Sequence, residues 1–416
     1  MQDIKKARIE IGMLFLLLVI VVPRMSMMFD FEYWTDWALY IHNHGLTSIY
    51  SNPTANYHPF YFYVIWLYDL VQGSEFYIRQ NIHFLKFFPL IFDFLPLVVL
   101  CCFRQTVVTE KIPYMYLLLN IAYLFNSYVW GQVDSIYSSL SFLALIFAFN
   151  RPVLSAFLFA MAMAMKPQPI VYIPVLAIAW LYSVRDLKTW LQLLFVIAAT
   201  WLLVALPFIV TSNGDKLWAI LSTPVGRYPR ISVGAFNLWY LATSKNPYHT
   251  PDAATYFILT YKQWGLILFF LSCGLALLPL FFRLARQKLN SEPIANDNQQ
   301  MLMLVSGLVT LNFFYFNTQM HERYAHPIML FFFFYAVYSK NYKLYILASI
   351  PYFLSLDKTF PDFLPVVHYK IIWASKVIAI WYTLTVIYAS WEYFRQYRIG
   401  AEYRLLKEAW KARKQI

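Results

Sequence analysis

The stretch TWLQLLFVIAATWLLVALPFIV, residues 189–210, contains no charged side chain. A transmembrane helix needs roughly 17–25 predominantly apolar residues, so a run of this length predicts a helix that crosses a bilayer. The rest of the chain has a similar character, because 60% of its 416 residues are hydrophobic and only 13% are charged. A soluble domain carries about 25% charged residues. The composition therefore indicates an integral membrane protein.

Apolar runs recur along the chain and predict an all-α polytopic membrane protein with about 12 transmembrane helices, within a range of roughly 10–14. Prolines interrupt the runs between residues 136 and 184, where the boundaries are least defined. Segments 34–43 and 59–72 mix Trp and Tyr with polar residues, which predicts short amphipathic helices in the first outer loop. The predicted spans are 11–28, 86–103, 113–129, 136–149, 152–165, 170–184, 189–210, 263–282, 300–318, 326–339, 344–356 and 370–391.

Basic residues gather in the short segments between alternate spans. More than half of the 33 Lys and Arg side chains fall on one side when the N-terminus is placed in the cytoplasm. By the positive-inside rule both termini are then cytoplasmic, and the longer segments 29–85 and 211–262 lie on the trans side. We expect one transmembrane domain at 1–391 and a basic cytoplasmic tail at 392–416. No small-residue cleavage site follows the N-terminal apolar run, which predicts an uncleaved first span.

The net charge of +12 does not indicate a nucleic-acid partner, because the basic residues lie between apolar runs instead of forming a patch on a soluble fold. Cys101, Cys102 and Cys273 lie inside apolar runs and offer neither a disulfide framework nor a metal-binding spacing. We expect them to be small apolar filler.

The first outer loop is acidic, with Asp30, Glu32 and Asp36 just beyond the end of the first predicted span. A partly desolvated carboxylate at the lipid–water boundary can act as a general base on an acceptor hydroxyl. Asp30 and Asp36 are therefore the candidate catalytic residues, and Glu32 is a weaker one. The alternative is an acidic, solvated loop that the positive-inside face repels.

Asp93 lies inside the apolar segment LKFFPLIFDFL, where an isolated carboxylate is costly in lipid. It must face the interior of the bundle and find a partner. Lys86 lies two helical turns earlier and hence on the same helix face. An internal pair of these two residues accounts for Asp93 as well as a role in substrate binding does.

The segment NSYVWGQVDSIY carries Asn126, Trp130, Gly131, Gln132 and Asp134 between two apolar runs. The glycine permits a tight bend, and the amide and carboxylate side chains can hydrogen-bond several sugar hydroxyls at once. The alternative for Asp134 is a helix cap.

Three basic residues on the predicted trans side are candidates to bind a phosphate. Lys166 ends a short apolar run in MKPQP, and Arg227 and Arg230 lie in PVGRYPR. A buried cation beside a break in the backbone suits a phosphate anion. The alternatives are snorkelling to the lipid head groups for Lys166 and a head-group anchor for the two arginines.

The segment MHERYAHP crowds His321, Glu322, Arg323 and His326 at the start of an apolar helix. The zinc motif H-E-x-x-H would require a histidine at position 325, which is Ala325, so a metalloprotease is excluded by the spacing. Arg323 can bind a phosphate through two hydrogen bonds while Glu322 holds its guanidinium. The alternative is a helix cap with an interfacial arginine.

Six motifs on one predicted side of the membrane resemble the GT-C class of membrane glycosyltransferases, especially the bacterial relatives of the GPI-anchor mannosyltransferases. The resemblance covers most of residues 10–340, and the last hundred residues show only a generic helical tail. In order, the motifs are FDFEYWTDWA, GLTSIYSNPTANYHPFYFYV, LKFFPLIFDFL, NSYVWGQVDSIY, MKPQP and MHERYAHP.

The resemblance implies a sugar donor linked to an isoprenoid phosphate. The acidic residue that defines the class corresponds most closely to Asp30, and Asp36 is an additional acid that leaves the choice of base open. His58 stands where the family carries a proline. Lys166 and Arg323 are implied to contact the phosphate, with Arg227 and Arg230 as further candidates. The residues expected to contact the sugar or the acceptor are Tyr57, His58, Trp130, Gln132, Asp134, Gln168, His321, Glu322 and Asp93.

We therefore expect an inverting glycosyltransferase that moves a hexose, most simply mannose, to a lipid-linked, glycan or protein acceptor. It is expected in a bacterial inner membrane, among membrane lipids, with its site facing the periplasm. The donor is already activated and carries a single phosphate, so no metal or other cofactor is required. A transporter or flippase of lipid-linked sugars is the alternative, although no internal repeat is visible in the sequence. A glycan polymerase or ligase that uses a lipid diphosphate is a second alternative.

Overall fold

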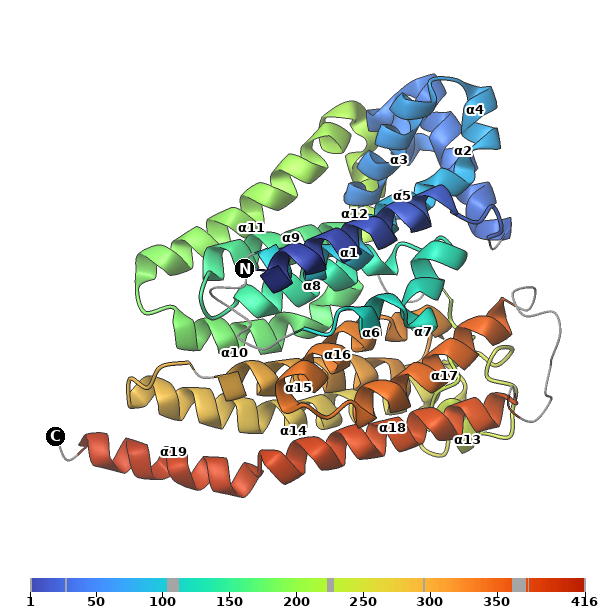
Figure 1. Ribbon diagram of the computed structural model, residues 1–416. Coiled ribbons are helices and arrows are strands. Elements are labelled where there is room, and N and C mark those ends of the chain that lie inside the picture. The colour runs from blue at the N-terminus through green and yellow to red at the C-terminus, as the bar shows by residue number, and fades with distance from the viewer. Residues whose placement is uncertain are drawn as a thin grey trace.

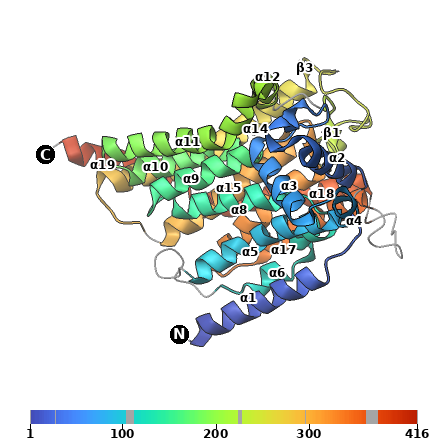
Figure 2. The ribbon, with the colours of Figure 1, turned by 90° about the horizontal axis from the view of Figure 1, so that it is seen from above.

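The structure is a computed structural model that describes residues 2–26, 28–102, 112–222, 228–294, 296–360, 372 and 374–414. Within these residues the regular structure is almost entirely helical, and the strands are two residues long. The predicted all-α class is thereby confirmed. Most of the long helices run side by side and form one bundle (Figures 1 and 2).

The first half of the chain forms twelve helices within the described residues, with single turns of 3-10 or π helix between some of them. The helices are α1 (Gln2–Ile20), α2 (Met28–His44), α3 (Pro59–Gln72), α4 (Glu75–Gln80), α5 (Phe87–Cys102), α6 (Met115–Leu118), α7 (Ile121–Leu124), α8 (Asp134–Phe147), α9 (Pro152–Met165), α10 (Ile173–Ser183), α11 (Leu187–Phe208) and α12 (Gly214–Ser222). The single turns are η1 (Leu46–Ser51), η2 (Ile82–Lys86), η3 (Phe125–Val129), η4 (Gln168–Tyr172) and η5 (Ile209–Asn213).

The second half adds the remaining helices and two small pairs of strands. The helices are α13 (Trp239–Ala242), α14 (Tyr261–Leu289), α15 (Asn296–Phe316), α16 (Pro327–Ser339), α17 (Lys343–Thr359), α18 (Ser375–Gln396) and α19 (Ile399–Lys414), with the 3-10 turn η6 (Glu322–Ala325). β1 (Ser232–Val233) pairs in parallel with β4 (Met320–His321), and β2 (Thr255–Tyr256) pairs antiparallel with β3 (Leu259–Thr260). The parallel pair ties the segment before α13 to the segment before α16.

Four helical stretches of the described chain are long and apolar enough to cross a membrane, namely Ile82–Cys101, Leu187–Thr211, Tyr261–Leu289 and Asn296–Phe316. Three shorter apolar stretches accompany them, Asp134–Phe147, Pro152–Met165 and Gln168–Ser183. These helices are compatible with an integral membrane protein, while the count of twelve spans remains a prediction.

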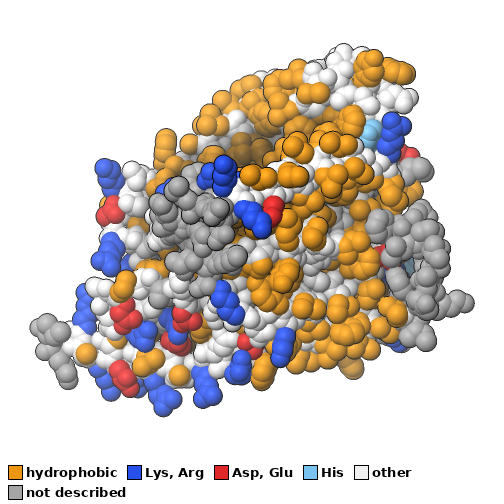
Figure 3. Space-filling model, in the orientation of Figure 1, with side chains coloured by type: hydrophobic (Ala, Val, Ile, Leu, Met, Phe, Trp, Pro, Cys, Tyr) orange, Lys and Arg blue, Asp and Glu red, His pale blue; other side chains and the backbone are white. Residues whose placement is uncertain are grey.

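The bundle has two distinct ends. Both termini lie at one end, which we call the termini end, whereas α2, α3, α4 and the short strands lie at the other, which we call the loop end (Figures 1 and 2). Lys and Arg side chains gather toward the termini end in Figure 3, and the middle of the bundle presents a largely hydrophobic surface. The predicted tail begins inside α18, which ends at Gln396, and its residues 399–414 form α19, which lies alongside α14.

Some predicted boundaries are correct and others are not. The predicted segments 59–72 and 152–165 coincide with α3 and α9. The predicted span 11–28 is wrong in its bounds, because α1 already ends at Ile20, shortly before Pro23. The predicted span 113–129 is not one continuous helix: Asn120, whose side chain accepts a hydrogen bond from the amide of Ala122, begins α7 anew. The first residues of the predicted span 370–391 lie outside the described residues.

The core of the bundle is built by α8, α15 and α16. Every residue of α8 is buried, and so is nearly every residue of α16. A helix that is buried on all sides needs neighbours on all sides, and α8 packs against α5, α9 and α16. Polar side chains at the ends of these helices are therefore placed inside the protein.

Candidate active site at the loop end

Asp134 and Lys166 meet because α8 and α9 form an antiparallel hairpin. Asp134 is the first residue of α8, and Lys166 directly follows the last residue of α9, so the short connection between the helices places both at the loop end. The Lys166 Nζ donates a hydrogen bond of 2.8 Å to Oδ1 of Asp134. Both side chains are buried, so the ion pair is shielded from solvent.

Arg323 reaches the same carboxylate from a distant part of the chain. It lies in η6, directly before α16, and its Nε is 3.4 Å from Oδ2 of Asp134. Its Nη1 donates to Oε1 of Glu322 at 3.2 Å. The guanidinium also lies 5.9 Å from the ring centroid of Trp130. One carboxylate therefore compensates two cations that come from separate helices.

Asp30 joins the cluster through Trp130 and Gln132. Its Oδ2 accepts hydrogen bonds from Nε1 of Trp130 at 2.9 Å and from Nε2 of Gln132 at 2.6 Å. Trp130 thus contacts Asp30 with its ring nitrogen while Arg323 lies over its ring. Asp30 is in the first turn of α2 and is only partly buried, so one carboxylate of the cluster remains accessible.

The bend between η3 and α8 depends on Gly131. Its φ is +88°, a conformation that residues with a side chain rarely adopt. A Cβ atom here would lie 3.0 Å from Cε1 of Phe31 and 3.3 Å from the side chain of Lys86. The glycine therefore allows Trp130 and Gln132 to approach α2 closely.

The role of Lys86 is not evident from the sequence. Instead of pairing with Asp93, its Nζ donates to the carbonyl oxygens of Pro23, Met25 and Val129 at 2.8, 2.5 and 2.8 Å. The Lys86–Asp93 pair, one of the two interpretations that the sequence left open, is thus contradicted, because the lysine lies in the 3-10 turn η2 and not in the helix that carries Asp93. Lys86 ties the connection between α1 and α2 to the segment that carries Trp130.

Asp93 forms a separate internal network. Its side chain accepts a hydrogen bond from Oγ of Ser127, and its Oδ1 lies 3.9 Å from Nε2 of His326. The His326 ring stacks on Tyr123 and shares a hydrogen bond of 3.0 Å with the Tyr352 hydroxyl. The partners of Asp93 are therefore Ser127 and His326 and not Lys86, and its role in substrate binding stays a prediction.

Tyr57 and His58 lie beside the cluster, just before α3. The Tyr57 ring centroid is 5.3 Å from Nζ of Lys166. Burial raises the pKa of the Tyr57 hydroxyl, the charge of Arg323 lowers it, and the charges of Asp30 and Asp134 raise it further. His58 is buried and shares a hydrogen bond of 2.8 Å with the carbonyl oxygen of Met163. Burial lowers the pKa of His58.

Asp36 points away from the cluster. On an α-helix, Asp30, Trp34 and Trp37 share one face, whereas Glu32, Asp36 and Leu39 share another. The Asp36 side chain is exposed, and its Oδ2 accepts hydrogen bonds from Asn52 and Thr54 at 2.9 and 2.8 Å. It lines a hollow on the outer side of α2. Of the two candidate bases, only Asp30 contacts the residues around Asp134.

The remaining candidates are distributed around the cluster. Gln168 lies in η4, two residues after Lys166. The His321 ring contacts the rings of Tyr228 and Tyr324. Arg230 lies apart: it is exposed, and its guanidinium is 4.9 Å from the ring centroid of Tyr248. Arg227 lies outside the described residues.

The charge of the cluster is nearly balanced. Lys166 and Arg323 face the carboxylates of Asp30, Asp134 and Glu322. Burial raises the pKa of Glu322, which favours its neutral form. A Cβ on Gly234 would lie 2.5 Å from Oε2 of Glu322, so this glycine leaves room for the carboxyl group.

Donor groups remain for a ligand. Within the described residues, Nη2 of Arg323 and two of the three N–H bonds of Lys166 have no hydrogen-bond acceptor. A buried lysine and arginine with uncommitted donors, fixed by a shared carboxylate, can bind a phosphate group. A carboxylate a short distance away can accept a proton. Among the described residues no group of three or more His, Cys, Asp or Glu is arranged to hold a metal ion.

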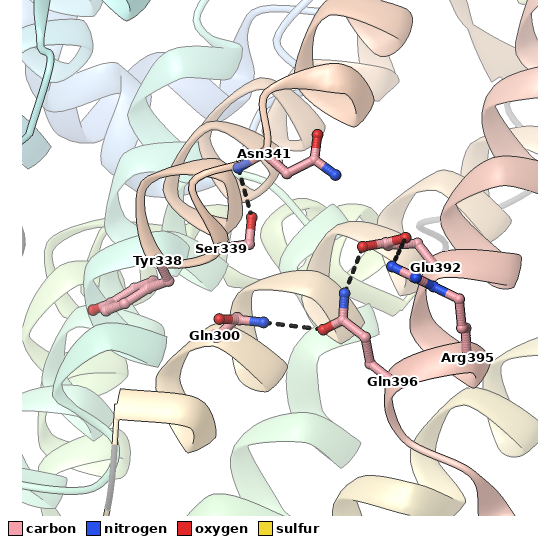
Figure 4. A pocket seen from close by; sticks show the side chains of 7 residues that line it. All are labelled: Gln300, Tyr338, Ser339, Asn341, Glu392, Arg395 and Gln396. Carbon is pink, nitrogen blue, oxygen red and sulfur yellow. Dashed lines mark hydrogen bonds and ion pairs between the residues drawn. The ribbon is translucent and has the colours of Figure 1, made fainter.

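A second hollow lies at the opposite end of the bundle. Its volume is about 420 Å³, and it lies between the ends of α15, α16 and α18 (Figure 4). Glu392 accepts hydrogen bonds there from Gln396 and Arg395, and Gln300 donates to Gln396. These polar groups satisfy one another, and the hollow is distant from the cluster around Asp134.

Searches against protein-family models and against curated protein sequences gave no match for this chain.

Proposed function

We propose that the chain is an integral-membrane glycosyltransferase that moves a hexose, with mannose as the expected sugar, from a polyprenyl-phosphate donor to a lipid-linked, glycan or protein acceptor. One observation carries the proposal. Asp30, Asp134, Lys166 and Arg323 come from four separate segments and converge at the loop end. This set of groups combines a partly exposed carboxylate with two cations held by a buried one.

The proposed reaction is a single displacement. Asp30 removes the proton from the acceptor hydroxyl, and the acceptor oxygen forms a bond to the anomeric carbon of the sugar. The bond between that carbon and the phosphate oxygen breaks, and its electron pair leaves with the polyprenyl phosphate. Lys166 and Arg323 stabilise the negative charge that grows on this phosphate, where preorganised donors are worth roughly 3–4 kcal/mol each.

The contacts of Asp30 support its assignment as the base. Two N–H donors hold Oδ2, so the carboxylate has a defined orientation, and within the described residues Oδ1 accepts no hydrogen bond. Trp130 joins it to Arg323, which keeps the base close to the phosphate-binding groups. Asp36 has no such link.

The distribution of charge supports the proposed orientation. The basic side chains at the termini end agree with cytoplasmic termini in a bacterial inner membrane, with the cluster facing the periplasm. A donor with a polyprenyl tail can then stay in the outer leaflet while its phosphate enters the cluster.

The experiment uses purified protein in proteoliposomes made from bacterial membrane lipids and supplied with radiolabelled polyprenyl-phosphate mannose. We expect label to move from the donor into a lipid, glycan or protein fraction. The Asp30→Asn variant should lose about 100-fold or more of this transfer, because a general base contributes roughly 10²–10⁴ in rate. The Asp36→Asn variant should keep most of it. The melting temperature of each variant serves as the folding control.

Normal transfer by both variants would show that neither carboxylate is the base and would overturn the mechanism. Movement of labelled donor across the bilayer without any new covalent product would favour the transporter. Loss of transfer in the Asp36→Asn variant alone would show that Asp36 is the base and that the reaction takes place on the other face of α2.

A further inference from the structure

A charged hollow lies on the face of α2 opposite to Asp30. Its volume is about 610 Å³, it is open to the surface, and it is lined by the segment that joins α1 to α2, by α2 and by α4. Arg24 and Arg79 line it from two sides, and Glu32 and Asp36 line it from α2. Phe31 and Leu39 supply an apolar wall. A hollow of this size falls within the range of small-molecule sites, about 300–1,000 Å³.

Hydrogen bonds to neighbouring carbonyl groups fix the backbone next to both Arg24 and Arg79. The carbonyl groups on both sides of Arg24, those of Pro23 and Met25, are bound by the buried ammonium group of Lys86. Ile78, which precedes Arg79, is fully buried, and its carbonyl accepts a hydrogen bond of 2.8 Å from Tyr68. The guanidinium groups themselves are exposed. The backbone positions of both arginines are therefore fixed before a ligand binds, while their guanidinium N–H groups are accessible from solvent.

Positively and negatively charged side chains both line the hollow, but they do not pair with each other within the described residues. Within the described residues, neither Arg24 nor Arg79 forms an ion pair, although Glu32 and Asp36 line the same space. The Asp36 carboxylate is oriented by Asn52 and Thr54. Guanidinium groups bind phosphate through paired hydrogen bonds, and carboxylates accept hydrogen bonds from an ammonium group. Such an arrangement is complementary to a ligand that carries a phosphate and an ammonium group.

The surroundings favour a lipid as the source of that ligand. α1 leads up to the hollow and exposes a row of apolar side chains, among them Leu16, Leu17 and Ile20. α1, α2 and α4 meet at the loop end, where lipid head groups would lie in the proposed orientation (Figure 1). Acyl chains can therefore lie along α1 while the head group enters the hollow.

We propose that this hollow binds the head group of a zwitterionic phospholipid of the phosphoethanolamine type. Arg24 and Arg79 bind its phosphate, and Glu32 and Asp36 accept hydrogen bonds from its ammonium group. The choline head group carries a phosphate too, but its trimethylated nitrogen has no N–H to donate. The site therefore discriminates between ethanolamine and choline lipids. This inference does not depend on the proposed transfer reaction.

The test is native mass spectrometry of the full-length protein in detergent. Phosphatidylethanolamine, phosphatidylcholine and phosphatidylglycerol with identical acyl chains are added in turn. We expect the ethanolamine lipid to be retained about tenfold more strongly than the choline lipid, the ratio that corresponds to one charge-assisted hydrogen bond. Equal retention of the two, or strongest retention of phosphatidylglycerol, would overturn the proposal.

Two variants test the binding of the phosphate and of the ammonium group separately. The double variant Arg24→Gln with Arg79→Gln should bind the ethanolamine lipid about tenfold more weakly or worse, because the phosphate loses its donors. Glu32→Gln should reduce the preference for ethanolamine over choline while retention of phosphatidylglycerol stays or rises. The control, Lys245→Gln with Lys262→Gln, removes two positive charges from exposed side chains elsewhere at the loop end. An equal loss in this control would overturn the proposal, because the effect would then be one of net charge.

A soluble competitor identifies the source of the ligand. If phosphorylethanolamine displaces the lipid only at high excess, the acyl chains contribute and the natural ligand is a lipid. If it binds tightly to protein free of added lipid, the same chemistry serves a soluble phosphoethanolamine compound, and the lipid assignment is overturned.

Discussion

Asp134 illustrates how a single residue organises the candidate site. Its carboxylate is fully buried and faces Lys166 and Arg323, so it compensates two cations that would otherwise be costly inside the protein. A substitution that removes this carboxylate should therefore strongly lower the free energy of unfolding. The same carboxylate holds both cations close together, with hydrogen-bond donors of each left over. Stability and the proposed phosphate binding therefore depend on one side chain.

Asp134→Asn is expected to lower the free energy of unfolding by about 3–5 kcal/mol, because it leaves buried charges uncompensated. The double variant Asp134→Asn with Lys166→Met should recover part of this loss, since it also removes one cation. It should stay inactive in the transfer assay. Melting temperatures of the three proteins in the same detergent provide the measurement. A single variant as stable as the wild type would show that Asp134 does not have this compensating role.

Among the elements, α15 and α16 pack tightly against each other at Gly307. Gly307 of α15 faces Phe331 and Phe332 of α16, and a Cβ atom at Gly307 would lie 2.3 Å from Cε1 of Phe332. Both rings are fully buried and cannot move away easily. The glycine thus sets the distance between the two helices, and α16 in turn fixes the position of Arg323 just before its first turn.

Gly307→Ala should therefore destabilise the bundle by about 1–3 kcal/mol, the usual cost of overpacking a core. Gly274→Ala is the matched control, because Gly274 is also helical but has no atom within 4 Å of its added Cβ. It should gain about 0.5–1 kcal/mol from helix propensity. Thermal unfolding of both variants gives the comparison. Equal melting temperatures would contradict the tight contact between α15 and α16.

For the whole molecule, the main feature is the separation of its two ends. Basic side chains gather toward the end that holds both termini. The cluster and the charged hollow of α2, which contain lysine and arginine side chains of their own, lie at the other end. An apolar middle connects them, as expected for a protein whose centre faces lipid. This arrangement leads to a test of orientation in intact cells.

One cysteine introduced in place of Lys245 and one in place of Glu408, in separate variants, should report opposite sides of the membrane. Both positions are exposed, the first at the loop end and the second in α19. A membrane-impermeant maleimide should label Lys245→Cys in cells whose outer membrane has been opened, and Glu408→Cys only after the inner membrane is lysed. The wild type shows the background from the native cysteines. Labelling of both positions from one side would contradict the proposed orientation.

Local sequence was sufficient for much of the architecture. Apolar runs predicted the helical class and the bounds of α9, and the mixture of aromatic and polar residues in 59–72 predicted α3, because helix-forming patterns act over a few residues. Local signals also pointed to the polar motifs at the loop end. They left open which of these residues contact one another.

Contacts between distant segments required the folded chain. The pairing of Asp134 with both Lys166 and Arg323, the three carbonyl partners of Lys86 and the outward direction of Asp36 all depend on how the helices pack. Packing selects the face that each helix turns inward, and it does so through the sum of many contacts between residues far apart in the chain. Spacing along one segment could place Lys86 near Asp93, but it could not reveal that backbone carbonyls bind the lysine instead.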